Sequence, residues 1–292
     1  MRLATIKHQG RETAAIVTAR GLVTLDELNC IVGSSWPTEL FTLITSGQLE
    51  SLNSWYCQEG GAELESMCIT RLPIDADYAP LYRHPRKIWG IGLNYAEHAR
   101  DLSETAPCAE PASFMKPDTT IIGPGDTVLV PLMSDRTTGE AELGIVIGQQ
   151  CKDVLQEDAY LVVAGFVPII DMTAEDILQR NPRNLTLSKS FDSFFSFGPQ
   201  MVTPDEIDDL LSLQVATYLN GQLHRRNVIS NMTFPPDFLI AFHSRVMTLL
   251  PGDIISTGTP GAAIIRDGDL IEARIDGFPR LANPVRDLKP AG

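Results

Sequence analysis

The feature that most constrains the fold is a succession of short apolar runs that fills the chain after residue 85. Turns rich in Gly, Pro and Asp separate these runs. Runs of this length suit β-strands, whereas helices of a globular core need longer periodic segments. The pattern predicts a strand-rich α+β fold with few helices. The runs are 87–91, 127–130, 143–147, 161–170, 213–219, 253–257 and 270–275.

The chain is expected to divide near residue 80. Residues 73–85 concentrate prolines and turn-forming residues, a composition typical of a connector. We therefore predict a small N-terminal α+β domain over residues 1–80 and a larger catalytic domain over 81–292. The strand-like pieces of the first domain are 3–6, 14–17 and 22–25, and its helix-like piece is 40–52.

Two further helices are predicted in the larger domain. Thr203 and Glu206 have the spacing of a capping box, with Pro204 at the first helical position. Residues 238–250 follow a Pro-Asp pair and are apolar at helical intervals. Both segments meet the usual signals of a helix N-terminus.

Composition favours a globular protein that acts on small molecules. The 292 residues are 43% hydrophobic and 21% charged, enough to bury a large core. A formal net charge of -14 argues against binding to nucleic acid or anionic membrane. No segment has the length and apolar character of a membrane span, so we expect a cytoplasmic protein. The five cysteines are scattered without zinc-ligand spacing.

Three carboxylates stand beside two of the apolar runs. Glu140 and Glu142 precede run 143–147, and Asp171 directly follows run 161–170. Residues two apart on a strand face the same way, so the two glutamates would project together. Clustered carboxylates repel each other unless a cation joins them, and hard oxygen ligands suit a divalent ion. The alternatives are solvated acids at strand ends and a turn or N-cap aspartate.

Basic residues and a hydroxyl-rich turn could complete a site. His98 and Asp101 lie three apart on a short predicted helix, where the carboxylate would make the imidazole a better general base. Lys189 lies among aromatic residues and could hold a developing negative charge in a cleft. Residues 251–260 form a strand and a tight turn able to bind a carboxylate. Each feature also occurs on ordinary protein surfaces.

The order of motifs resembles the fumarylacetoacetate hydrolase family over roughly residues 85–285. The N-terminal 75 or so residues resemble the small leading domain of bacterial members more weakly. The motifs are GLNYAEHA, FMKP, GPGD, EAELGIVIG, AGFVPIIDMTAED, KSFDSFFSFGP, YLNG and PGDIISTGTP.

This resemblance implies a mixed β-sandwich roll that binds Mg²⁺ or Mn²⁺ through Glu140, Glu142 and Asp171. It also implies that a 2-oxo acid or 1,3-diketo acid completes the metal coordination, and that the metal polarises its carbonyl. The family's charge-stabilising lysine falls on Lys189. Its carboxylate-binding threonine falls on Thr259. Its water-activating histidine falls on His98.

The chain departs from the family pattern at the substrate pocket. Glu175 stands where members carry an arginine, and Leu178 where they carry a glutamine. Arg180 and Arg183 are candidates to restore the lost positive charge. Asp101 replaces the usual glutamate partner of the histidine.

We therefore expect the pocket either to recruit a different cation or to accept a different substrate. Asp192, in the motif that contains Lys189, and Glu175 are the further residues predicted to bind substrate.

Three functions are compatible with these residues. The first is a metal-dependent hydrolase of a C–C bond in an acylpyruvate or 1,3-diketo acid. The second is an isomerase, decarboxylase or dehydratase of a 2-oxo or 2-hydroxydienoic acid, which needs no attacking water. The third is an inactive binding protein on the same fold. In each case we expect a small 2-oxo acid partner, no nucleic acid, no membrane, and a homodimer as in many members.

Overall fold

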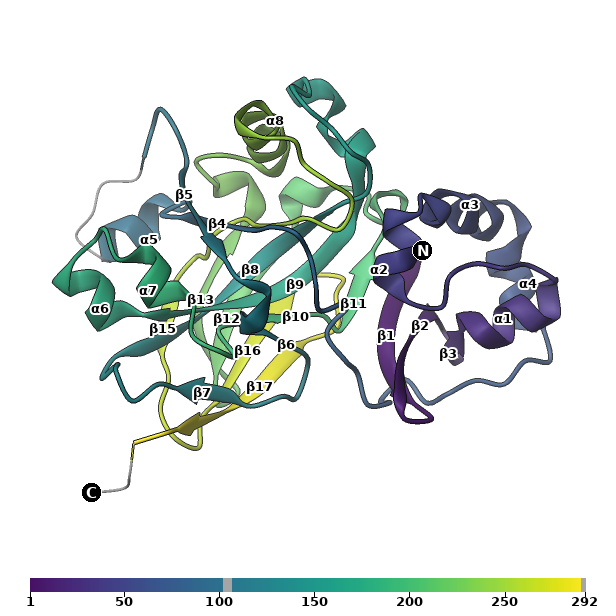
Figure 1. Ribbon diagram of the computed structural model, residues 1–292, viewed down its shortest axis with the longest axis horizontal. Helices are drawn as coiled ribbons and strands as arrows, with labels where there is room; N and C mark the ends of the chain where they lie inside the picture. The colour runs from purple at the N-terminus through teal and green to yellow at the C-terminus, as the bar shows by residue number, and fades with distance from the viewer. Residues whose placement is uncertain (102–106, 290–292) are drawn as a thin grey trace.

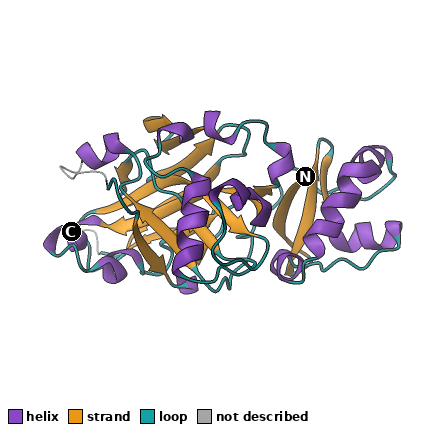
Figure 2. Cartoon of the chain, turned by 90° about the horizontal axis from the view of Figure 1, so that it is seen from above, coloured by secondary structure: helices purple, strands orange, loops and turns teal. Residues whose placement is uncertain are grey.

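Two mixed β-sheets, surrounded by short helices, make up the described part of the chain. The computed structural model describes residues 1–101 and 107–289 (Figure 1). Each apolar run that was predicted to be a strand overlaps one, and the strand-rich α+β prediction is confirmed. Figure 2 shows most helices outside the strands, with the densest group at the N-terminal end. Among the described residues, no helix is long and apolar enough to cross a membrane.

The larger sheet runs in the order β3-β2-β1-β11-β9-β8-β14-β4-β5, and β6, β10 and β15 join it at the sides. Most of its pairs are antiparallel, whereas β14 with β4 and β10 with β6 are parallel. Its strands are β1 (Arg2–His8), β2 (Arg11–Thr18), β3 (Gly21–Thr24), β4 (Ile88–Gly92), β5 (Ala112–Lys116), β6 (Ile121–Ile122), β8 (Thr137–Ile147), β9 (Val163–Ala174), β10 (Phe195–Phe197), β11 (Gln200–Val202), β14 (Ile254–Ser256) and β15 (Ala262–Ile264).

The smaller sheet packs against the middle of the larger one. Its order is β13-β12-β16-β17-β7. Apolar side chains from both sheets meet in one core, including Leu143 and Ile170 of the larger sheet and Ile271 of the smaller. Two layers that share a core are the sandwich arrangement expected for a strand-rich chain. The strands of the smaller sheet are β7 (Val128–Val130), β12 (Gln214–Leu219), β13 (Gln222–Val228), β16 (Leu270–Ile275) and β17 (Leu281–Asp287).

The N-terminal strands extend the larger sheet. Backbone pairing of β1 with β11 sets Leu3 opposite Met201. A second core lies beneath the N-terminal helices and also contains Val146 and Phe197 from the rest of the sheet. The division near residue 80 therefore stays a prediction, because the larger sheet and the second core both contain residues from either side of it. The helices of this part are α1 (Leu25–Val32), α2 (Leu40–Thr45), α3 (Gln48–Trp55), the π-helix Tyr56–Gly60 and α4 (Gly61–Ser66).

Two helix predictions need correction. The single helix predicted over 40–52 is two helices, because Gly47 between them adopts a left-handed φ of 74°. The helix predicted at 203–206 is one 3₁₀ turn, Pro204–Glu206, without a side-chain cap. Thr203 instead accepts a hydrogen bond from the buried N-terminal ammonium group of Met1 at 2.6 Å. The helix predicted at 238–250 is present as α8 (Pro236–Val246).

Strands β8 and β9 are longer than the apolar runs that predicted them. Both continue through the acidic residues, with Thr137 paired to Ala174 at the far end. The two strands are buried along almost their whole length. The alternative that the acids are solvated residues at strand ends is therefore wrong, because the backbone ladder of β8 and β9 continues past all three of them.

Three short helices gather at the end of the molecule opposite α1–α4 (Figure 1). They are α5 (Ala96–Asp101), α6 (Glu175–Arg180) and α7 (Leu185–Lys189). Helix α5 follows β4, and α6 follows β9 directly. The helices therefore stand over the ends of the strands that carry the acidic residues.

Candidate functional site

Glu140, Glu142 and Asp171 form a carboxylate cluster on the paired strands β8 and β9. The antiparallel register sets Glu140 opposite Asp171 and Glu142 opposite Ile169. One carboxylate oxygen from each of the three residues lies within 4.8 Å of the others, and all three residues are buried. Same-face alternation on β8 and strand pairing with β9 thus bring the acids together, as predicted from the sequence.

Two buried lysines contact this cluster. Lys189, at the end of α7, donates to Asp171 at 2.5 Å and to Glu140 at 3.4 Å. Lys116, at the end of β5, donates to the other oxygen of Asp171 at 2.5 Å and to the carbonyl of Met172 at 3.1 Å. Asp171 is thus held between two ammonium groups.

Lys116 was not among the site residues predicted from the sequence, although it lies in the FMKP motif. A signal was present, because Phe114 and Lys116 lie two apart on one strand and so face the same side.

The environment moves the pKa values in the cluster in opposite directions. Burial tends to raise the pKa of Asp171, but the ammonium groups of Lys116 and Lys189 outweigh it and hold the pKa below its usual value. Burial and the neighbouring carboxylates raise the pKa of Glu142 to about 8. Burial and the neighbouring acids therefore disfavour a third negative charge in the cluster, and a bound cation would allow all three carboxylates to be ionised.

Hydroxyl and backbone donors orient the two glutamates. Glu142 accepts from Ser256 Oγ at 2.5 Å and from the backbone N–H of Gly258 at 2.8 Å. Thr138 and Thr173 donate to Glu140 at 3.3 and 3.2 Å. The strand and turn at residues 251–260, which were predicted to bind a carboxylate, therefore bind the carboxylate of Glu142.

Gly258 cannot be replaced by another residue without strain or a steric clash. Its φ is +94°, and a Cβ there would lie 2.8 Å from the Cβ of Asn94. Asn94 donates to the carbonyl of Thr257 at 2.8 Å and so ties β4 to this turn. A residue other than glycine would therefore displace the N–H that supports Glu142.

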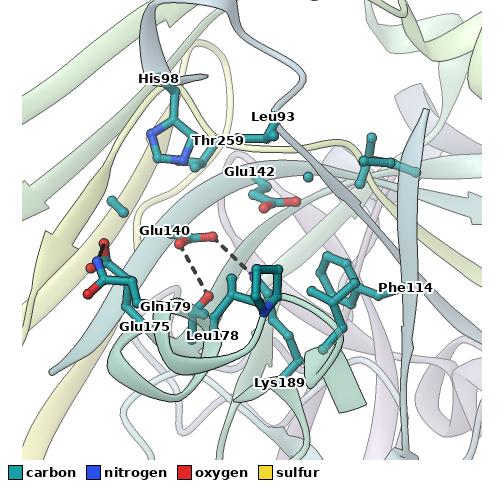
Figure 3. A pocket seen from close by; sticks show the side chains of 17 residues that line it. Leu93, His98, Phe114, Glu140, Glu142, Glu175, Leu178, Gln179, Lys189 and Thr259 are labelled. Atoms are coloured by element: carbon teal, nitrogen blue, oxygen red, sulfur yellow. Dashed lines mark hydrogen bonds and ion pairs between the residues drawn. The ribbon is translucent and has the colours of Figure 1, made fainter. Parts of the chain in front are cut away.

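The carboxylate cluster opens into a cavity of about 460 Å³. Figure 3 shows Glu140 and Glu142 pointing into it, with His98 above them and Lys189 below. His98 is buried on α5, and the Lys189 ammonium group lies 4.5 Å from the centre of the Phe114 ring. The remaining lining is mostly apolar: Ile91, Gly92, Leu93, Ala112, Thr173, Glu175, Leu178, Gln179, Pro182, Leu185, Thr259 and Ala262.

The other predicted site residues lie in different places. Thr259 lines the cavity, and its hydroxyl hydrogen-bonds to the backbone of Gly261 at 3.2 Å. Asp192 is exposed and is not among the lining residues, so the structure does not bring it to the site. The side chain of Asp101 lies outside the described part of the chain, and its pairing with His98 stays a prediction.

Arg136 pairs with Glu175, whereas Arg180 and Arg183, the candidates to restore positive charge to the pocket, do not reach it. Arg136 Nε donates to Glu175 at 2.7 Å. Both predicted arginines are exposed and neither lines the cavity. Arg136 was not predicted from the sequence because it precedes β8 whereas Glu175 follows β9, and only the pairing of these strands brings the two residues together.

Comparison with known proteins places the chain among related sequences and folds. The family model described as fumarylacetoacetate (FAA) hydrolase C-terminal matches residues 87–286. An uncharacterized protein from Pyrococcus horikoshii is 38% identical over 223 residues, covering 75% of this chain and 95% of that protein. A mitochondrial oxaloacetate tautomerase from Xenopus laevis is 36% identical over 211 residues, covering 69% of this chain and 66% of the relative.

The fold match extends over nearly the whole chain. Maleylpyruvate hydrolase from Sphingobium sp. SYK-6, solved with manganese(II) and pyruvate, superposes with a TM-score of 0.79 at 28% identity, covering 99% of this chain and 100% of that one. The match includes the N-terminal part, for which the sequence resemblance was weak. The family model and the relatives together show that this chain belongs to the fumarylacetoacetate hydrolase family.

Proposed function

We propose that this protein is a divalent-metal-dependent hydrolase that cleaves a C–C bond in an acylpyruvate or 1,3-diketo acid. One observation carries the proposal: three buried carboxylates have oxygens within 4.8 Å of one another, and two of them, those of Glu140 and Glu142, face a cavity that His98 and Lys189 also line. Buried carboxylates in this number are rare without a cation, and perturbed groups beside a cavity mark functional sites.

The donor set fits Mg²⁺ or Mn²⁺. All three ligands would be carboxylate oxygens from Glu140, Glu142 and Asp171, and hard oxygen donors suit these ions better than zinc or copper. Ser256, Gly258 and the two threonines would hold the ligands in place. A bound divalent ion would polarise the substrate carbonyl and lower the cost of negative charge on it.

Residues around the cluster would carry out the remaining steps. Thr259 would bind the substrate carboxylate through its hydroxyl. His98 would take a proton from the attacking water, whose oxygen adds to the acyl carbonyl carbon. The C–C bond would then break, and its electron pair would pass to the 2-oxo fragment. The Lys189 ammonium group, held beside Glu140 and Asp171, would stabilise that negative charge.

A tautomerase or isomerase is the second candidate. The relative from Xenopus laevis carries the name of an oxaloacetate tautomerase, and it is 36% identical to this chain. Such a reaction moves a proton between carbon and oxygen of a 2-oxo acid and needs no attacking water. The same metal ligands and Lys189 would support it, whereas His98 would act on carbon-bound protons.

The test separates these two candidates by their products. The purified protein is stripped with EDTA, reloaded with Mn²⁺ or Mg²⁺, and incubated with acylpyruvates and with oxaloacetate in ¹⁸O-labelled water. Hydrolysis gives two fragments, one of which carries ¹⁸O, by mass spectrometry. Tautomerisation leaves the carbon chain intact and changes only the enol absorbance. Absence of both products with either metal would contradict the proposal.

The His98→Ala variant tests the water-activating role. It is expected to lose hydrolysis by at least about 100-fold while it keeps Mn²⁺ affinity. Unchanged hydrolysis would contradict the water-activating role of His98.

The predicted homodimer and the predicted cytoplasmic location stay proposals. Sedimentation of the purified protein would test the homodimer.

A further inference from the structure

One side of the cavity, the α6 wall, is formed by the short helix that follows β9. The α6 wall consists of Glu175, Leu178 and Gln179 (Figure 3). Leu178 adds an apolar surface to it, and both oxygens of Glu175 already accept hydrogen bonds. One bond comes from Gln179 Nε2 at 3.0 Å and the other from Arg136 Nε at 2.7 Å.

Arg136 reaches Glu175 from outside the cavity. Its side chain is 47% exposed, whereas that of Glu175 is 9% exposed. Arg136 does not line the cavity, so a ligand inside it would meet the carboxylate of Glu175 rather than the guanidinium group. The wall is therefore balanced in charge as a whole but presents its negative part to the ligand.

Basic side chains among the described lining residues are limited to Lys189 and His98. Lys189 is already engaged by Asp171 and Glu140. No arginine appears in the lining within the described part of the chain. A charged group at the far end of a ligand would thus find no uncommitted arginine or lysine there.

The charge of the cluster sets how many substrate carboxylates it can balance. With all three carboxylates ionised as ligands of a divalent ion, the charges of the acids, of Lys116 and Lys189 and of the ion would sum to one positive charge. One substrate carboxylate neutralises that charge. A second carboxylate would lie beside Glu175 in a partly desolvated cavity, where like charges repel strongly.

We propose that the site selects 2-oxo acids with a single carboxylate and an uncharged, apolar tail, and that Glu175 with Leu178 excludes dicarboxylates. This inference rests on the proposed function, because it assumes that a metal-bound 2-oxo acid occupies the cavity. Leu93, Phe114, Leu178 and Leu185 provide the apolar surface for the tail. Oxaloacetate, a dicarboxylate, would then be a poor ligand.

Two unreactive probes of matched shape test the selection. 2-Oxoglutarate ends in a carboxylate, and 5-methyl-2-oxohexanoate replaces that carboxylate with an isopropyl group of similar size. Both have the same 2-oxo acid head. Calorimetric titration into the Mn²⁺-loaded protein should give binding of the isopropyl probe at least about tenfold tighter.

A substitution of Glu175 and a matched control test whether the charge of Glu175 causes the selection. Glu175→Gln keeps the shape and removes the charge, so the ratio of the two dissociation constants should fall by at least about threefold, mainly through tighter binding of 2-oxoglutarate. Glu157→Gln, the same change at an exposed position outside the cavity, should leave the ratio unaltered.

The outcomes distinguish the two levels of the proposal. Equal binding of the probes, or tighter binding of 2-oxoglutarate, overturns the selection but leaves the 2-oxo acid site standing. Failure of both probes to bind a protein that retains Mn²⁺ overturns the proposed function and the selection with it. A ratio that Glu175→Gln does not change overturns the role of Glu175.

Discussion

The carboxylate cluster and the α6 wall both bury acidic side chains, but they balance the charge in different ways. Asp171 is held by two lysines that are themselves buried, so its partners have little access to solvent. Glu175 is paired with an arginine that is half exposed. Charges in the interior interact strongly and cannot be screened, whereas water and salt weaken a pair at the surface. Substitutions in the carboxylate cluster should therefore lower the free energy of unfolding strongly, whereas substitutions at the α6 wall should lower it little.

The largest effect is expected for Asp171→Asn. The change leaves two buried ammonium groups without their main partner, so the free energy of unfolding without metal should fall by about 3 kcal/mol. Mn²⁺ affinity should fall by at least about 100-fold, because a ligand is lost. Urea unfolding and metal titration measure both. Asp158→Asn, at an exposed site, is the control and should stay within about 0.5 kcal/mol.

Substitutions of the two lysines should lower stability by similar amounts but turnover by different amounts. Lys189→Met and Lys116→Met each break a buried pair with Asp171, so both should lower stability by about 3 kcal/mol. Lys189 lines the cavity and Lys116 does not. Turnover should therefore fall about 100-fold in Lys189→Met but less than about tenfold in Lys116→Met. Equal losses of kcat would show that the cavity contact of Lys189 has no chemical role.

Metal binding should stabilise the fold through the cluster. At a concentration about 100 times its Kd, Mn²⁺ is expected to add about 2.7 kcal/mol to the free energy of unfolding. Glu140→Gln removes one ligand, so most of this gain should disappear. Glu175→Gln lies outside the cluster and should retain the gain. Thermal unfolding with Mn²⁺ and with EDTA provides the comparison, and an equal gain in all three proteins would argue against metal binding at Glu140.

The smallest effect is expected at the α6 wall. Arg136→Met removes the partner of Glu175 and should lower stability by about 1 kcal/mol, since the arginine is half exposed. Arg183→Met, at an exposed site with no predicted effect, is the control. The difference between the two variants should shrink in high salt, when measured by urea unfolding. A loss as large as that of Asp171→Asn would remove the contrast between the two regions.

The sequence predicted the strands and one part of the site because these depend on local patterns. Apolar runs mark buried strands wherever they pair, and Glu140 and Glu142 share a face by alternation alone. Helix signals near residue 203 failed for a long-range reason. The amino group of Met1 hydrogen-bonds to Thr203, so the hydroxyl that would cap the helix serves another contact.

By itself, therefore, the sequence determined the strand-rich fold, the family motifs and the paired glutamates. Only the tertiary structure decided which cations balance which acids: Lys116 and Lys189 on Asp171, and Arg136 rather than Arg180 or Arg183 on Glu175. The physical reason is that charge pairing depends on distance and burial in space, which strands far apart in sequence set when they pair. Local periodicity carries no information about those distances.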